Sequence, residues 1–143
     1  MRVFVVEDEI EGYRKVIKDA LLGHEVTYAL SRPQAQELWK GLGAYDLVLL
    51  DHDMEGYYES SEAPNTGYQF LKWALEAECP DGPYLDKVAP LFVVHTQNNI
   101  GALNMLRLLR DYQLGSRVMP FHTTIYPRFL VMLIADMERS KNS

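Results

Sequence analysis

Short apolar runs that end in polar residues recur along this chain, and they alternate with segments whose apolar residues are spaced three or four apart. The runs are typical of strands buried on both faces, and the wider spacing is typical of amphipathic helices. The predicted strands occupy residues 3–6, 24–29, 45–51, 91–95 and 117–121. The predicted helices occupy residues 10–21, 32–42, 67–75, 101–112 and 125–139. Regular alternation of strand and helix predicts an α/β protein with a parallel sheet and helices on both faces.

Polar side chains follow the first, third and fourth predicted strands directly. They are Glu7 and Asp8, then Asp51, His52 and Asp53, then His95 and Thr96. Parallel sheets of this kind bind ligands outside the carboxyl ends of their strands. The sequence therefore predicts a functional site at that edge, built from residues far apart in the chain.

Composition narrows the class of protein. The 143 residues suit one domain, 1–143, and we find no repeat or linker. The formal charge of −6 disfavours binding to long duplex nucleic acid. Cys79 is the only cysteine, so an internal disulfide is excluded and a reducing, cytoplasmic location is expected. No segment is apolar enough for a membrane span or a signal peptide, so no membrane partner is expected.

Three segments resemble a known family. They read LDHDM at residues 50–54, NTGY at 65–68 and VHTQNNIG at 94–101. In this spacing they are similar to the cyclic-phosphate processing receiver domain, found in bacteria and their phages. The resemblance implies a receiver-like, flavodoxin-like fold with strand order 2-1-3-4-5, and a phosphoesterase that processes 2′,3′-cyclic phosphates at RNA ends or in small nucleotides.

The catalytic residues expected from this resemblance are His52, His95, Asp51 and Asp53. Hydrolysis of a cyclic phosphate needs a base that activates water and an acid that protonates the departing oxygen. Two imidazoles on neighbouring strands can supply both, because histidine titrates near neutral pH. We therefore expect His52 and His95 to face one phosphate, with an aspartate orienting one of them. The alternative is that each histidine only bonds nearby backbone.

Substrate contacts are expected from Thr66, Gly67, Thr96, Asn98 and Asn99, which lie at or before predicted helix starts. Hydroxyl, amide and backbone N–H groups there can hold a phosphate, although the same side chains also cap helices. Separately, Tyr57, Tyr58 and Tyr68 could stack on a base or pack against the core.

Two questions stay open. Either no cofactor is required, or Glu7, Asp8 and Asp51 hold Mg²⁺ as receiver carboxylates do. The function is either hydrolysis or binding of a nucleotide or a protein without chemistry. A third function, phosphorylation of Asp51 as in response regulators, ranks last because the stretch 118–121 lacks the lysine that receivers use.

Overall fold

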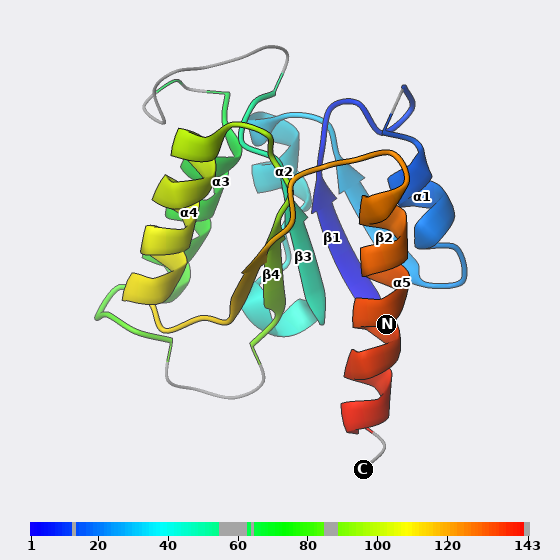
Figure 1. Ribbon diagram of the computed structural model, residues 1–143. Coiled ribbons are helices and arrows are strands. Elements are labelled where there is room, and N and C mark those ends of the chain that lie inside the picture. Colours follow the sequence, from blue (N-terminus) through cyan, green and yellow to red (C-terminus); the bar gives the residue numbers. More distant parts are fainter. Residues whose placement is uncertain (13, 55–62, 64, 85–88, 142–143) are drawn as a thin grey trace.

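The computed structural model describes residues 1–143 except 13, 55–62, 64, 85–88 and 142–143 (Figure 1). In the described part of the chain, five parallel strands form one sheet in the predicted order β2-β1-β3-β4-β5. The strands are β1 (Arg2–Val6), β2 (Glu25–Ala29), β3 (Leu47–Leu50), β4 (Leu91–Val94) and β5 (Ser116–Val118). The α-helices are α1 (Val16–Ala20), α2 (Arg32–Leu38), α3 (Gly67–Glu78), α4 (Asn99–Asp111) and α5 (Ile125–Lys141), with a short 3-10 turn at Leu42–Ala44.

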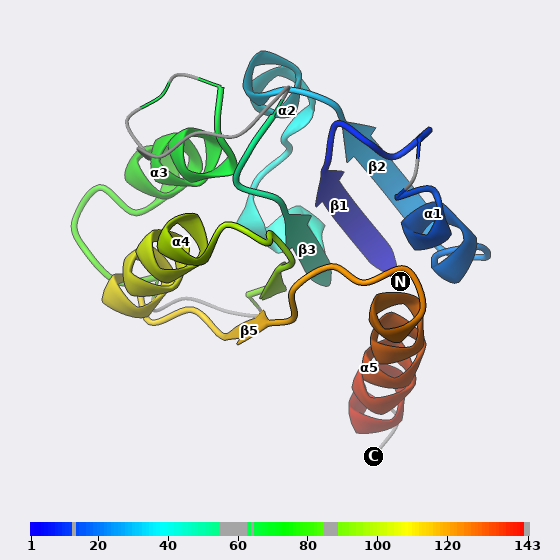
Figure 2. The ribbon, with the colours of Figure 1, turned by 45° about the horizontal axis from the view of Figure 1, so that its top comes forward.

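The helices cover both faces of the sheet, which makes three layers (Figure 2). On one face α1 and α5 lie side by side, and on the other lie α2, α3 and α4. Each face has its own apolar core: Tyr126 and Leu130 of α5 pack on the first, and Phe70 of α3 and Met105 of α4 on the second. Residues of one strand alternate between the two cores, so the face of any side chain follows from its position.

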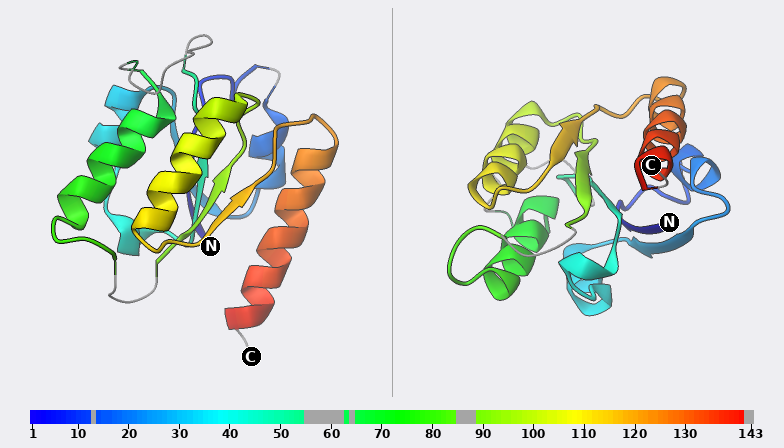
Figure 3. Two further views of the ribbon diagram at one scale, coloured as in Figure 1. Left: turned by 60° about the vertical axis from the view of Figure 1, so that its left-hand side comes forward. Right: turned by 90° about the horizontal axis from the view of Figure 1, so that it is seen from below.

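The central strand, β3, has all four of its residues buried. Its continuous apolar run was the strongest strand signal in the sequence. A strand that is covered by helices on both faces needs apolar residues at every position, which explains this run. The long helix α5 reaches past the edge at which the strands begin (Figure 3). None of the helices in the described ranges combines the length and the apolar character needed to cross a membrane.

Several predicted elements are shorter in the structure, among them the helix predicted over 32–42, which ends at Leu38, and the strand predicted over 45–51, which spans Leu47–Leu50. Two further differences have a clear physical reason. The first helix begins at Val16 rather than near residue 10, because the Glu7 carboxylate accepts the backbone N–H of Glu9 and holds the preceding segment in turns. The last strand ends at Val118 rather than Phe121, and Pro120, which has no N–H to donate, follows closely.

Candidate functional site

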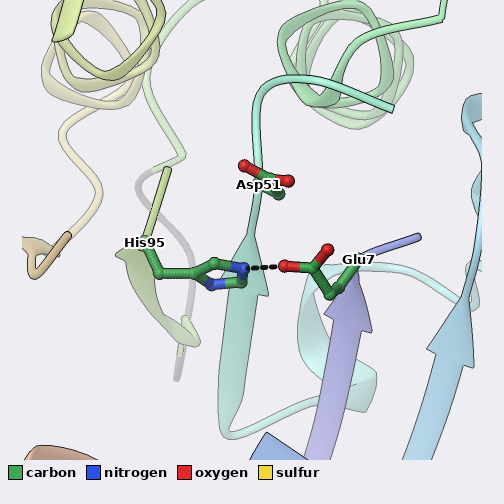
Figure 4. Close-up of side chains that lie close together, drawn as sticks. All are labelled: Glu7, Asp51 and His95. Carbon is green, nitrogen blue, oxygen red and sulfur yellow. Dashed lines mark hydrogen bonds and ion pairs between the residues drawn. The ribbon is translucent and has the colours of Figure 1, made fainter. Parts of the chain in front are cut away.

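Three polar side chains meet where β1, β3 and β4 end. The last residues of these strands are paired in register, Val6 with Leu50 and Leu50 with Val94. The next residues are Glu7, Asp51 and His95, whose backbone N–H groups continue the ladder. Register-paired residues of parallel strands point to the same face, so these side chains converge on the α1/α5 side, and ligand atoms of all three lie within 4.8 Å of one another (Figure 4).

A buried arginine joins this acidic strand-end cluster, which we define as Glu7, Asp51 and His95. Nη1 of Arg14 lies 2.7 Å from Oε1 of Glu7 and 3.1 Å from Oδ2 of Asp51. The guanidinium carbon lies 4.7 Å from the ring centroid of Phe121, and the Arg14 side chain is only 6% exposed. The two carboxylates are thus neutralised in part by a cation of the chain itself.

His95 is held between two partners in the core. Its Nε2 lies 2.8 Å from Oε1 of Glu7, and its Nδ1 lies 3.1 Å from the hydroxyl of Tyr126 on α5. A carboxylate can only accept, so Nε2 donates to Glu7, while Nδ1 and the Tyr126 hydroxyl share the second hydrogen bond. The imidazole is 0% exposed and both of its nitrogens are engaged, which is the arrangement of a positioning residue.

The pKa values of the two carboxylates of the cluster are shifted in opposite directions, although burial raises both. Burial alone would raise the pKa of Glu7, but the hydrogen bond and charge of His95, together with Arg14, lower that pKa below its usual range. For Asp51, burial and the adjacent Glu7 carboxylate raise the pKa to about 6, against the opposing effects of His95, Arg14 and a hydrogen bond from Thr96. One carboxylate therefore stays ionised while its neighbour titrates well above the normal aspartate range.

His52 lies on the other face of the sheet. It follows Asp51 by one residue, and its ring packs against α4 so closely that a Cβ on Gly101 would lie 2.3 Å from His52 Cγ. Nδ1 of His52 is 2.7 Å from Oδ1 of Asp53, and Nδ2 of Asn98 is 3.3 Å from each carboxylate oxygen of Asp53. These contacts define a second polar group, the His52–Asp53–Asn98 triad.

We expected His52 and His95 to face one phosphate, and the structure contradicts this. His95 contacts Glu7 and Tyr126 on the α5 face, whereas His52 contacts residues of the α4 face. The physical reason is the alternation of side chains: Leu50 is paired with Val94, so the next residues, Asp51 and His95, point to one face and His52 points to the other. Asp53 does contact His52, as expected, but Asp51 contacts Arg14 instead.

The residues expected to hold phosphate take several positions. Thr66 caps α3 by accepting from Gln69 N–H at 3.1 Å and donates to the Ala63 carbonyl at 3.2 Å. Gly67 lies so close to the strand end that a Cβ there would be 1.8 Å from the Asp51 carbonyl oxygen. Gly67 thereby lets α3 start beside the cluster.

The remaining expected contacts lie around the start of α4. Asn98 caps the helix by accepting from Gly101 N–H at 3.0 Å, and Thr96 accepts from Asn98 N–H at 3.1 Å. Asn99 is exposed in the first turn of α4. Tyr68 packs partly buried against the core, and Tyr57 and Tyr58 lie outside the described residues.

The expected Mg²⁺ ligands are not arranged for that ion. Glu7 and Asp51 lie together, but the third group within ligand distance is the His95 imidazole rather than Asp8. Mg²⁺ prefers oxygen ligands and octahedral geometry, while here a guanidinium already contacts both carboxylates. The residues therefore do not fit Mg²⁺, and no chemical step is assigned to it.

Sequence reasoning missed two residues that contact the acidic strand-end cluster, Arg14 and Tyr126. Both come from segments outside the strand ends, and neither belongs to the segments that carried the resemblance. Aligning the three strand ends by their apolar runs would have grouped Glu7, Asp51 and His95. Only the packing of α5 and of the segment before α1 shows which cation and which hydroxyl complete the group.

Solved structures of receiver domains have a fold similar to that of this chain. The HemR receiver domain from Leptospira biflexa is 23% identical, with a TM-score of 0.59 over 95% of this chain and 93% of that chain. The response regulator domain of Thermotoga maritima CheB is 18% identical, with a TM-score of 0.55 over 100% and 97%. A Francisella response regulator receiver domain is 14% identical, with a TM-score of 0.53 over 98% of both chains. At these identities the similarity concerns the fold alone.

No curated protein sequence shows significant similarity to the chain. The model of the cyclic-phosphate processing receiver domain matches residues 3–111. This range contains the polar residues at the ends of β1, β3 and β4, among them Glu7, Asp51, His52, Asp53 and His95. The chain belongs to the cyclic-phosphate processing receiver domain family.

Proposed function

We propose that this domain hydrolyses a cyclic phosphate, on an RNA end or a small nucleotide, with His52 as its single acid–base group. The observation that supports this most directly is the 2.7 Å contact between Nδ1 of His52 and Oδ1 of Asp53 at the carboxyl end of β3. A carboxylate on one ring nitrogen fixes the tautomer and the orientation of the ring. The description of the family agrees with this substrate class.

The chemistry needs only one histidine. Because Asp53 accepts from Nδ1, a neutral His52 carries its lone pair on Nε2. That nitrogen takes a proton from the attacking water while the water oxygen bonds to phosphorus. The bond from phosphorus to the ribose oxygen on the opposite side then breaks, and that oxygen takes a proton from solvent water. The imidazolium releases its own proton to solvent, which yields a phosphomonoester and restores neutral His52.

Negative charge on the phosphate is balanced by the start of α4. This helix of 13 residues begins directly after Asn98, and its first N–H groups and positive dipole end favour an anion. Asn98 holds the carboxylate of Asp53, which keeps His52 oriented toward the same helix. His95, on the other face, is assigned a positioning role through Glu7.

Turnover of defined substrates tests the proposal. Purified protein is incubated with 2′,3′-cyclic mononucleotides and with an RNA oligomer that ends in a cyclic phosphate. We expect His52→Ala to lose about 100-fold or more in rate, as for loss of a general acid–base group. His24→Ala is the matched control, because His24 contacts the amino terminus, Met1, far from this edge. Absence of turnover in the wild type, or equal turnover in His52→Ala, would contradict catalysis.

A second candidate is a binding module without chemistry. One observation favours it: the His52 side chain is only 1% exposed, so its ring is covered by neighbouring groups. A binder needs donors at the edge but no access to the imidazole. Calorimetry that shows stoichiometric binding of a cyclic nucleotide, recovered intact afterwards, would establish this function in place of hydrolysis.

A further inference from the structure

We infer that the Arg14 guanidinium is the resident cation of the acidic strand-end cluster, in place of a divalent metal ion, and that its removal opens a latent metal site formed by Glu7, Asp51 and His95. Arg14 bonds to Glu7 at 2.7 Å and to Asp51 at 3.1 Å through the same nitrogen, Nη1. An arginine between two carboxylates supplies positive charge at the position where an ion would bridge them. This role is independent of whether the chain turns over a substrate.

The arginine is fixed there by more than charge. Its side chain is 6% exposed, and its guanidinium carbon lies 4.7 Å from the ring centroid of Phe121. Arg14 precedes α1, and the turns that carry it are tied to the cluster because Glu7 also accepts the backbone N–H of Glu9 at 3.0 Å. Moving the guanidinium away would therefore disturb both a cation–π contact and the local turn.

A metal ion would have to compete for an oxygen that is already saturated. Oε1 of Glu7 accepts from both Arg14 Nη1 and His95 Nε2, at 2.7 and 2.8 Å. Coordination by this oxygen requires that a buried ion pair be broken and that a guanidinium be left without its carboxylate partners. Breaking a buried pair in this way is strongly unfavourable. The wild-type chain is thus expected to leave the cluster free of metal.

Without the guanidinium, the same atoms make a donor set. Two carboxylates and one imidazole, with ligand atoms within 4.8 Å of one another, offer mixed oxygen and nitrogen coordination. The Nε2 of His95 becomes a ligand when the ring carries its proton on Nδ1 instead, where the Tyr126 hydroxyl accepts it. That combination suits Mn²⁺ or Zn²⁺ better than Mg²⁺, which prefers oxygen alone. The latent site thus takes a first-row divalent metal.

Binding of Mn²⁺ to the wild type and to Arg14→Met tests this directly. Methionine keeps an unbranched apolar side chain at the position but removes the charge. We expect the melting temperature of the wild type to be insensitive to Mn²⁺ and that of Arg14→Met to rise, with affinity for Mn²⁺ at least about tenfold higher than in the wild type. Lys18→Met is the matched control, since Lys18 is an exposed cation paired with Glu11, and it should behave as the wild type does.

Three further measurements make the result decisive. Adding Asp51→Asn to Arg14→Met should abolish the gain, because one ligand is lost. If Arg14→Met does not fold alone, refolding in Mn²⁺ replaces the melting experiment: recovery supports the latent site, and no recovery overturns it. In the wild type, Mn²⁺ that selectively broadens the NMR signals of residues flanking Glu7, Asp51 and His95 would show that metal enters despite Arg14 and would refute the inference.

Discussion

The close packing of α4 on His52 makes Gly101→Ala a sensitive probe of the His52–Asp53–Asn98 triad. Gly101 is the third residue of α4, so an alanine there changes little in the backbone. Its Cβ, however, would lie 2.3 Å from Cγ, 2.5 Å from Cδ2 and 2.8 Å from Nδ1 of His52. The substitution therefore pushes directly on the ring that the proposed chemistry uses, without altering any of its partners.

The expected magnitudes follow from these distances. Nonbonded carbons pack at about 3.5–4.0 Å, so the ring has to retreat by roughly 1 Å. A shift of that size is enough to break the 2.7 Å contact between His52 and Asp53. Overpacking of this kind lowers the free energy of unfolding by about 1–3 kcal/mol, while replacing glycine by alanine in a helix raises it by about 1 kcal/mol. Net destabilisation of up to about 2 kcal/mol is expected, with a disproportionate loss of activity.

Urea unfolding, together with ¹⁵N chemical shifts of the His52 ring, measures both effects. Gly43→Ala is the control, because a Cβ at Gly43 would meet nothing within 4 Å. We expect Gly101→Ala to change the His52 tautomer signature and to lower turnover at saturating substrate, and Gly43→Ala to change neither. Unchanged ring signals in Gly101→Ala would refute the close packing, and lost activity with unchanged ring signals would refute the role of the His52–Asp53 contact.

Two other predictions concern the acidic strand-end cluster. Gly67→Ala should destabilise the protein by about 3 kcal/mol or more. The new Cβ would lie 1.8 Å from the Asp51 carbonyl oxygen, and a backbone atom cannot move away as a flexible side chain can. A free energy of unfolding in urea equal to that of the wild type would contradict this. The pKa of Asp51 in the folded protein is raised from 3.8 to about 6, so protonation of Asp51 stabilises the fold. This stabilisation is complete below about pH 4 and is lost as the pH rises through about 6, which lowers the free energy of unfolding by at most about 3 kcal/mol. Asp51→Asn should remove this part of the pH dependence, and parallel stability curves for variant and wild type between those pH values would exclude it.

Much of the architecture was determined by local sequence patterns. The apolar run of β3 and the alternation of strands with helical spacing were sufficient to predict a parallel sheet, because both faces of such a sheet are buried. Polar residues directly after those runs identified the edge that carries the candidate site. The contact between Asp53 and His52 could also be predicted from the sequence, because the two residues are adjacent in the chain.

The pairing of strands and the packing of distant segments decided which of these residues meet. A one-residue difference in register turns a side chain to the opposite face, so His95 joined Glu7 and Asp51 while His52 packed under α4. Arg14 entered the cluster through the turns before α1, and no pattern of apolar spacing contains that information. Chain order determined the strands and their edge, whereas pairing across the sheet and the packing of distant segments determined the charge and chemistry found there.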